Sequence, residues 1–503
     1  MGDGGADRDL VIAEELLGDD VMRQVVVVDP LDHEGHVGHE RGPRRWHAQR
    51  GVPILQPVDD AQHAPGEIAL AAGPERAQLR DRVDAEGRHL LRQVGVELAQ
   101  LLHVEQIPRG DRERVTEREL WPLVHIVEIL EQPAQRGGAP DALWPALDVL
   151  EPRQIYIAAL LGAAEMLHTG TISVVDHFRQ TPMNLAAVDA VAEGYRDSGM
   201  KAVIAVMLRD VPQFKGQLLP SATDQIGIVE QAHLNCDTLK CSKVRVALGP
   251  SAPTRCTEKL LISARDLAFR HGLYLHTHID ETTTDAEEAR KQYGKSSIQY
   301  LANLDLLTPF LSLAHGVWLN SEDFELLAAA GSTVVHNPVS NMRLGSGIAP
   351  LTALLEHGVS VALGSDGAAS NDGQDMFEAL KAAVLLQRVA GVEAKYWFTA
   401  KEALPLVTST PARVFGFGTG QITIGAPADF IAINRSGYSF TPQNDWHRQL
   451  VFGGNGLKVR YAVVAGKLLL DDERITTFDE ENILAEAREI GMRIYTKPGD
   501  HVV

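Results

Sequence analysis

Apolar runs with two different spacings alternate along most of the chain. The stretch "QIYIAALLGAAEMLHTG" repeats its apolar residues every three or four positions and ends at Gly170, which predicts a helix. The next stretch, "TISVVDH", is short, apolar and rich in β-branched residues, which predicts a buried strand. An alternation of helices and strands is therefore expected from about Arg153 onward.

Further runs of the strand type follow, each bounded by Gly, Pro or polar residues: "KAVIAVML", "KVRVALGP", "LYLHTHID", "FLSLAHGV", "STVVHNP" and "VSVALGSDG". Helical stretches such as "CTEKLLISARDLAFRHG" and "SEDFELLAAAG" separate them. Such alternation implies a parallel sheet, because parallel neighbours are joined only through crossovers. The number of units favours an α/β fold of the (β/α)₈ TIM-barrel type over a doubly wound sheet.

The pattern changes after "GAPADF". Short strand-like runs, "ADFIAIN" and "VRYAVVAGKLLL", precede the helical stretch "EENILAEAREIGMRIY". We therefore predict a barrel over residues 151–424 and a small β-sandwich-like appendage with a closing C-terminal helix over residues 425–503.

Residues 1–150 have an anomalous composition. Before Leu150 there is no Lys, Ser, Asn, Phe, Tyr or Cys, and Thr116 is the only threonine. Ser and Asn supply many helix caps and turns, so a domain without them lacks common folding devices. Two interpretations stay open: a genuine but unusual domain, with helical pieces around "LRQVGVELAQLLHVEQI", or a GC-rich reading frame that is not the natural one.

Charge and cysteine content narrow the class of partner. The formal net charge of −20 argues against sequence-independent nucleic-acid binding, which needs a basic surface. Three cysteines, Cys236, Cys241 and Cys256, make a disulfide framework improbable. No apolar run is long enough to cross a bilayer, and the acidic N-terminus is unlike a signal peptide. We expect a cytoplasmic protein without a membrane or nucleic-acid partner, acting on small molecules.

Ionisable residues stand at the ends of five predicted strands. They are Asp176 and His177, His276 and His278, His315, His336, and Asp366. Barrel enzymes place their chemistry at the rim formed by the C-terminal ends of the strands, because the interior is packed. A single histidine on an apolar strand is more often a core residue than a ligand. The convergence of several at one rim favours a functional site.

The stretch "LYLHTHIDET" gives the most direct indication of a metal. His276 and His278 are two residues apart and share a face of the strand, with Glu281 in the loop beyond. A neutral imidazole suits Zn²⁺ or Fe²⁺, and a carboxylate beside the metal can accept a proton from water. Asp366 ends another apolar strand, where a buried carboxylate is costly without a cation or donors. Its alternative role is a turn or helix cap in "SDGAASND".

An ordered set of motifs over residues 153–495 resembles the amidohydrolase superfamily. The motifs are "HTHIDET", "LAHGV", "HNPVSNMRLGSGIAP", "LGSDGAASNDGQDMFEALKAA", "TSTPARVFGF" and "IGAPADFIAIN". They are most similar to the branch that contains S-adenosylhomocysteine and methylthioadenosine deaminases, guanine deaminase and triazine hydrolases. The resemblance implies a metal-dependent hydrolase that removes an amino, alkylamino or halide group from a carbon of a nitrogen heterocycle of the purine, pterin or triazine type.

The resemblance also implies roles for individual residues. His278 corresponds to a metal ligand, Glu281 to a proton shuttle, and His315 to the histidine that polarises the attacked group and the water. Asp366 corresponds to a ligand and general base. One divalent metal is implied, with zinc expected and iron as the alternative.

Four further residues are expected to contact the substrate. They are His177, His336, Ser340 and Asn341, the last three in "HNPVSN". The alternative for that motif is a structural turn held by Pro338.

One element of the family pattern is missing. The superfamily's H-x-H ligand pair on the first barrel strand has no counterpart before residue 150. His33, His36 and His39 in "DHEGHVGHE" could share a helix face, but two glycines weaken a helix and no strand precedes them. We therefore expect a barrel that is incomplete at its first strand, with an open edge. His278 and Asp366 alone should bind a metal weakly, because a catalytic zinc usually has three protein ligands.

Two alternative functions stay open at this point. One is cyclic amide hydrolysis of the imidazolonepropionase type, and the other is a catalytically impaired or non-enzymatic chain that lacks the H-x-H pair. The resemblance also makes a homodimer an expectation to be tested.

Overall fold

The computed structural model describes residues 25–27, 150–180, 183–212, 217–238, 243–436, 438–454 and 457–495. These residues all belong to one compact unit of the chain, and the second unit, residues 33–121, lies outside them. The two interpretations of residues 1–150 therefore fall almost entirely outside the described residues. The predicted domain boundaries stay a prediction.

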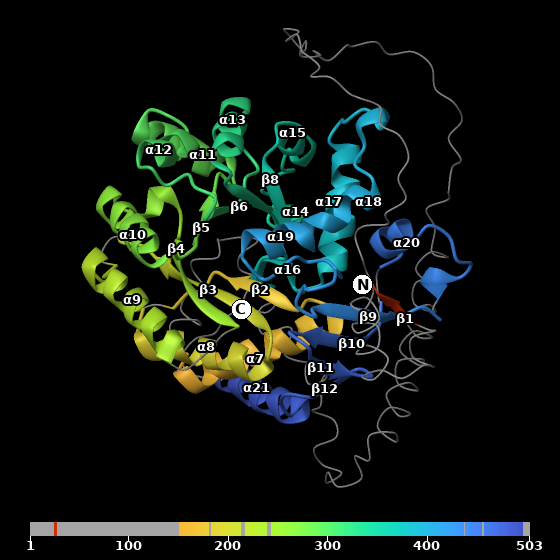
Figure 1. The fold of residues 1–503 in the computed structure, drawn as a ribbon. Helices are drawn as coiled ribbons and strands as arrows, with labels where there is room; N and C mark the ends of the chain where they lie inside the picture. Colours follow the sequence, from red (N-terminus) through yellow and green to blue (C-terminus); the bar gives the residue numbers. More distant parts are fainter. Residues whose placement is uncertain are drawn as a thin grey trace, which may run out of the picture. The chain divides into compact units, whose positions relative to one another are not determined.

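A seven-stranded parallel sheet forms the centre of the described unit (Figure 1). Its strands follow one another in chain order: β2 (Ser173–Asp176), β3 (Lys201–Leu208), β4 (Val244–Pro250), β5 (Leu275–Ile279), β6 (Leu311–His315), β7 (Thr333–His336) and β8 (Ser360–Leu363). Every neighbouring pair is parallel. The sheet curls as a barrel does, which confirms the predicted TIM-type architecture.

The predicted strands and the observed ones agree closely. β3 spans the apolar run "KAVIAVML" from end to end, and its central residues Ala202 to Val206 are all buried. Burial on both faces explains why these strands are continuous apolar runs without polar alternation. Hydrophobic residues of the sheet and the surrounding helices join in one large core cluster.

Helices lie around the outside of the sheet (Figure 1). Successive helices pack on one another, as α8 does on α7 and α9. The α-helices of the described residues are α7 (Pro152–Thr169), α8 (Leu185–Ser198), α9 (Ala222–Thr238), α10 (Glu258–His271), α11 (Thr283–Tyr293), α12 (Ser297–Asn303), α13 (Ser321–Ala330), α14 (Pro338–Arg343), α15 (Leu351–Glu356), α16 (Ala368–Asn371), α17 (Met376–Val389), α18 (Ala400–Ala403), α19 (Ser409–Val414), α20 (Trp446–Gly453) and α21 (Glu480–Tyr495).

Local sequence signals explain where these helices begin and end. α7 starts with Pro152 in its first turn, and Glu151 and Gln154 form a reciprocal capping box. Gly170 follows with φ 92°, a left-handed conformation that glycine adopts without a steric penalty. α10 begins after Thr257, whose side chain accepts a hydrogen bond from the Leu260 N–H, and its C-cap is Gly272, which is also left-handed. Of these signals, the sequence analysis used Gly170, and the N-terminal caps are findings of the structure.

Within the described residues the sheet does not close, as the sequence predicted. Among the described residues β2 pairs only with β3, and β8 pairs only with β7. A closed barrel would need a further strand between β2 and β8. The described sheet is thus a seven-stranded, incomplete barrel, as expected from the missing first-strand motif.

A second, antiparallel sheet forms the appendage. Its order is β1 (Val25–Val27), β9 (Phe430–Asn434), β10 (Val459–Val464), β11 (Lys467–Asp471) and β12 (Arg474–Ile475). The sequence predicted β9 to β11, but not the pairing of β1 with β9, which aligns Val26 with Ile433. The appendage is therefore one sheet that recruits a strand from near the start of the chain.

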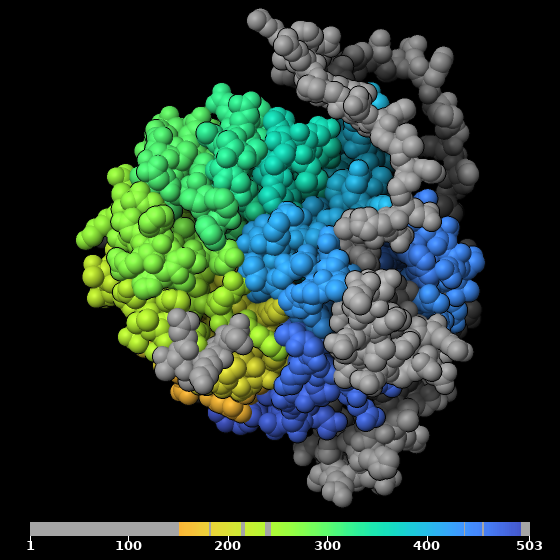
Figure 2. Space-filling view, in the orientation of Figure 1, coloured from red at the N-terminus to blue at the C-terminus, as the bar shows by residue number. Residues whose placement is uncertain are grey.

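Polar contacts attach the appendage and the final helix to the barrel unit. Lys201 at the start of β3 forms an ion pair with Asp429, which precedes β9. The predicted closing helix, α21, packs on α7, and the Glu486 carboxylate accepts a hydrogen bond of 2.7 Å from Arg153. In Figure 2 the blue surface of α21 lies directly against the orange surface of α7.

Two predictions about the chain as a whole can be compared with the described residues. None of their helices combines the length and apolarity needed to cross a membrane. Cys236 and Cys256 are buried and form no disulfide, and Cys241 lies outside the described residues. The cytoplasmic location stays a prediction.

Candidate active site

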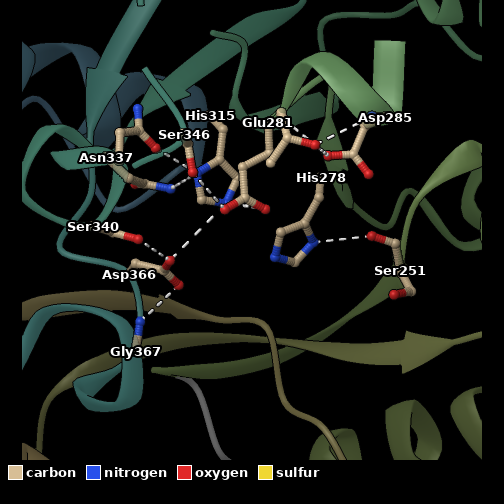
Figure 3. Close-up of polar contacts among 12 residues, drawn as sticks. Ser251, His278, Glu281, Asp285, His315, Asn337, Ser340, Ser346, Asp366 and Gly367 are labelled. Carbon is tan, nitrogen blue, oxygen red and sulfur yellow. Dashed lines mark hydrogen bonds and ion pairs between the residues drawn. The ribbon is translucent and has the colours of Figure 1, made fainter. Parts of the chain in front are cut away.

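Four predicted catalytic or ligand side chains come together at the C-terminal ends of the strands (Figure 3). His278 lies on β5 and Glu281 in the loop after it, His315 ends β6, and Asp366 follows β8. The Nε2 atom of His315 lies 3.8 Å from Glu281 Oε2 and 4.0 Å from Asp366 Oδ2. Because parallel strands end at the same face, residues far apart in sequence meet at this point.

His278 is held in one orientation by the backbone of the neighbouring loop. Its Nδ1 donates a hydrogen bond of 2.9 Å to the carbonyl oxygen of Ser251, and Figure 3 shows the ring between Ser251 and Asp366. With the proton on Nδ1, the lone pair of Nε2 is available on the opposite side of the ring. Burial, followed by the nearby charge of His315, lowers the pKa of His278 to about 3. The side chain is therefore neutral, as a metal ligand must be.

His315 and Asp366 both adopt unusual backbone conformations. Their φ angles are 73° and 65°, in the left-handed region that non-glycine residues rarely occupy. Such strain is often found at functional sites, where the surrounding contacts maintain it. Here His315 Nδ1 donates to Asn341 Oδ1 at 2.9 Å, and the Ser340 hydroxyl donates to Asp366 Oδ2 at 2.7 Å.

The environment of Asp366 favours the ionised form. Burial alone raises its pKa, but the nearby His315, the Ser340 hydrogen bond and His278 outweigh that effect and lower the pKa below its usual value. The backbone N–H of Gly367 also donates to Asp366 Oδ1 at 2.8 Å. A carboxylate at this position is consequently available as a ligand or proton acceptor.

Glu281 has a partner that the sequence did not reveal. The Ser346 hydroxyl donates to Glu281 Oε1 at 3.2 Å, which leaves Oε2 on the side of His315 (Figure 3). Ser346 follows α14 and is 65 positions away from Glu281 in the chain. The short stretch "GSG" around it gave no indication of this contact.

The predicted substrate-binding residues occupy two different environments. His177 lines the cavity, and its ring centroid lies 4.7 Å from that of His278. His336, Ser340 and Asn341 are fully buried and are not among the residues that line the cavity. Ser340 and Asn341 instead contact Asp366 and His315 directly. Their role in binding substrate stays a prediction.

His276 is arranged as a packing residue of the strand. Its Nδ1 is hydrogen-bonded to Ser312 Oγ at 2.7 Å, and burial lowers its pKa to about 4. This contact lies between β5 and β6, within the sheet. Both histidines of "LYLHTHIDET" line the cavity, and they differ in the partner of Nδ1, which is a side chain of the next strand for His276 and the Ser251 carbonyl for His278.

A cavity of about 610 Å³ opens next to these side chains. It is bounded by residues of β2 and β8, the two end strands of the sheet, and His278 and Asp366 lie in its wall. Ile172, Phe377 and Ile431 contribute apolar surface to it. A cavity of this size that combines apolar walls with a few polar groups suits a small organic molecule.

The described residues supply part of a metal site. One neutral imidazole and one carboxylate, His278 and Asp366, form a nitrogen and oxygen donor set that fits Zn²⁺ or Fe²⁺. No group of three or more His, Cys, Asp or Glu side chains within the described ranges is arranged to hold a metal ion. The donor types therefore fit a divalent metal, but the set is smaller than the three protein ligands usual for catalytic zinc.

The amidohydrolase family sequence pattern matches residues 124–469. The chain belongs to the amidohydrolase family. It is 33% identical to the 5'-deoxyadenosine deaminase of Methanosarcina acetivorans over 347 residues, which cover 69% of this chain and 77% of that protein. Membership in this family makes the chain a hydrolase that acts on carbon–nitrogen bonds.

Solved structures of amidohydrolases have the same fold. An adenosine deaminase from Xanthomonas campestris with bound zinc matches with a TM-score of 0.64 and 27% identity, over 71% of this chain and 79% of that one. An atrazine chlorohydrolase from Arthrobacter aurescens in complex with zinc matches with a TM-score of 0.64 and 25% identity, over 74% and 84%. The family is metal-dependent, and both of these structures contain zinc.

Proposed function

We propose that this amidohydrolase removes an amino, alkylamino or halide group from a ring carbon of a nitrogen heterocycle, with one divalent metal, zinc, as cofactor. The observation that carries the proposal is the convergence of Glu281 and Asp366 on His315 Nε2 beside the cavity. Deaminases of adenine nucleosides and a triazine chlorohydrolase among the similar proteins support the choice of substrate class.

The two carboxylates can divide the proton transfers between them. Replacing a ring amino group by water requires that one proton leaves the attacking water and that another reaches the departing nitrogen. Asp366 would accept the first proton, and Glu281 would deliver the second. Both are within 4.0 Å of the same imidazole nitrogen, so they flank one common point.

His315 would orient the reacting groups. Since its Nδ1 donates to Asn341, its Nε2 faces the two carboxylates and the reacting atoms. From there it can form a hydrogen bond with the water or with the ring substituent that is attacked. His177, whose ring lies 4.7 Å from that of His278, would contact the heterocycle.

His278 and Asp366 would hold the metal. When bound, the metal would act as a Lewis acid that makes water a stronger nucleophile at neutral pH. The expected homodimer and the other expected partners stay predictions.

A substrate panel tests this proposal. The zinc-reconstituted chain should release ammonia from at least one aminopurine or pterin, or an amine or halide from a triazine. Glu281→Gln, prepared in the same way, is the matched control and should release the product at least about 100-fold more slowly. If the zinc-reconstituted chain opens an imidazolone ring and leaves every aminopurine, pterin and triazine unchanged, the proposed class of substrate is wrong.

A further inference from the structure

Three hydrogen bonds to the predicted catalytic groups come from one short stretch of chain. We call Ser340 to Ser346, the second half of α14 and the turn after it, the α14 segment. Its first residue, Ser340, donates to Asp366, and the next residue, Asn341, accepts from His315. Its last residue, Ser346, donates to Glu281.

The three contributing side chains are buried. Ser340 and Asn341 are 0% exposed and Ser346 is 4% exposed. A buried hydroxyl or amide that makes a hydrogen bond to a neighbouring polar side chain restricts the orientations of both partners. These contacts are therefore suited to holding the reactive side chains in place before any substrate arrives.

The position of Ser346 is fixed from both sides. Its N–H donates to Asn341 O at 2.8 Å, and its carbonyl accepts a hydrogen bond of 2.9 Å from the indole of Trp318. Gly347 follows with φ 125°, and an added Cβ there would lie 2.9 Å from a methyl group of Val317. The turn thus packs closely against the loop after β6, and its hydroxyl has little freedom to move.

Glu281 depends more on a hydrogen-bonding partner for its orientation than His315 and Asp366 do. It lies in a loop rather than at a strand end, its side chain is long, and it is 20% exposed. The Ser346 hydrogen bond to Oε1 leaves Oε2 on the side of His315. Without this bond the carboxylate could turn toward solvent at little cost.

We propose that the α14 segment is a positioning element for the whole site, and that Ser346, supported by Trp318, sets the orientation of the Glu281 carboxylate. Ser346 and Trp318 are positioning residues, because they act through Glu281 and not on the substrate. This inference rests on the proposed function for its catalytic meaning, but its structural part concerns only contacts within the chain.

The test compares Ser346→Ala with Ser346→Thr, which restores a hydroxyl, and with Ser360→Ala. Ser360 on β8 is a matched control because its shielded hydroxyl makes no hydrogen bond with the described residues. Ser346→Ala should lower kcat about 10-fold and leave KM within about twofold, because the lost contact orients a proton donor and not the substrate. Ser346→Thr should recover most of the activity, and Ser360→Ala should behave as the parent chain.

A crystal structure of metal-free Ser346→Ala provides a readout that does not depend on activity. The Glu281 side chain should leave its present orientation, whereas His315 and Asp366 should keep theirs. An unchanged Glu281 in that structure, or an unchanged kcat, overturns the inference. If the parent chain itself turns over no heterocycle, the proposed function fails, and the orientation of Glu281 still decides the structural part.

Trp318→Phe extends the test to the support of Ser346. It removes the indole N–H that binds the Ser346 carbonyl and keeps most of the aromatic surface. Trp318→Phe should lower kcat, but by less than Ser346→Ala does. An increase in KM with an unchanged kcat would assign Trp318 to substrate contact and contradict its positioning role.

Discussion

The two sides of the cavity differ in how their polar side chains are satisfied. On the side of β6 and β8, His315 and Asp366 each have a close partner on the α14 segment. On the side of β2, neither ring nitrogen of His177 makes a hydrogen bond of normal geometry with the described residues, although the backbone of Gly249 lies near. Polar atoms shielded from water without a partner are costly, and they often mark a place where a ligand binds.

This difference separates two functions of the site. Close partners on the α14 segment hold His315 and Asp366 in place without a ligand. The other side presents an imidazole whose contacts within the chain are incomplete, next to the ring of His278. We infer that His315, Glu281 and Asp366 carry the chemistry and that His177 contributes to ligand recognition, and the predictions for the two carboxylates and for His177 test that division.

The largest effect on activity is expected from Glu281 and Asp366, the two carboxylates near His315. Glu281→Gln should lower kcat by about 10²–10⁴-fold, the range for a lost general acid or base, and should leave bound metal nearly unchanged. Asp366→Ala should lose both turnover and metal, because it removes a ligand as well as a base. Steady-state kinetics together with metal analysis of each purified variant would separate the two roles.

The same pair of variants can contradict these assignments. Equal loss of metal in Glu281→Gln and Asp366→Ala would mean that Glu281 is also a ligand. Asp366→Asn serves as a control of similar size, and it should weaken metal binding without creating a cavity.

Not every polar group near β7 is satisfied: His336, Asn337 Oδ1 and Asn341 Nδ2 lack partners among the described residues, and His336 makes stability depend on pH. It is fully buried on β7 without a hydrogen-bond partner among the described residues, and burial lowers its pKa to about 3. Below pH 6.5 the unfolded chain gains a proton on this histidine that the folded chain cannot take up until about pH 3. The free energy of unfolding should therefore fall by about 1.4 kcal/mol per pH unit in that window through this group alone.

Urea unfolding of His336→Gln at several pH values checks that contribution. Between pH 6.5 and 4 the variant should lose stability less steeply than the parent chain, with the remaining dependence coming from other buried groups such as His276, whose pKa is about 4. Identical slopes in the two proteins would show that His336 does not remain neutral in the folded state.

The smallest effect is expected at His177, just after β2. His177→Ala should raise KM about 10-fold and change kcat by less than about threefold, because a contact with the heterocycle affects binding more than chemistry. His177→Gln keeps a polar side chain in the cavity, so its KM should lie between those of the parent chain and His177→Ala. A large loss of kcat or of bound metal in His177→Ala would show that His177 takes part in the chemistry and would contradict its assignment to ligand recognition.

Much of the fold followed from apolar spacing and from caps. β3 and α21 have the bounds that their apolar runs predicted, because buried parallel strands and capped helices depend on local sequence. The pairing of β1 with β9 was not predictable, since it joins parts of the chain more than 400 positions apart and Val25–Val27 is too short a run to indicate a partner.

The candidate site was predictable in part for a similar reason. His278, His315 and Asp366 were expected to meet because each lies at the C-terminal end of a parallel strand, and the structure brings them together. The partners of these residues were not expected. Ser346 reaches Glu281 only through the conformation of the turn after α14 and its contact with Trp318, and no short motif encodes that geometry.

The metal content of the purified chain is the most direct test of a metal-dependent hydrolase. Elemental analysis of the chain, expressed with zinc and desalted, should find a substantial fraction of an equivalent of a divalent metal, and Asp366→Ala should contain almost none. Less than about a tenth of an equivalent in the parent chain would contradict the enzyme function for this polypeptide, because His278 and Asp366 would then lack the ligands that complete a catalytic site.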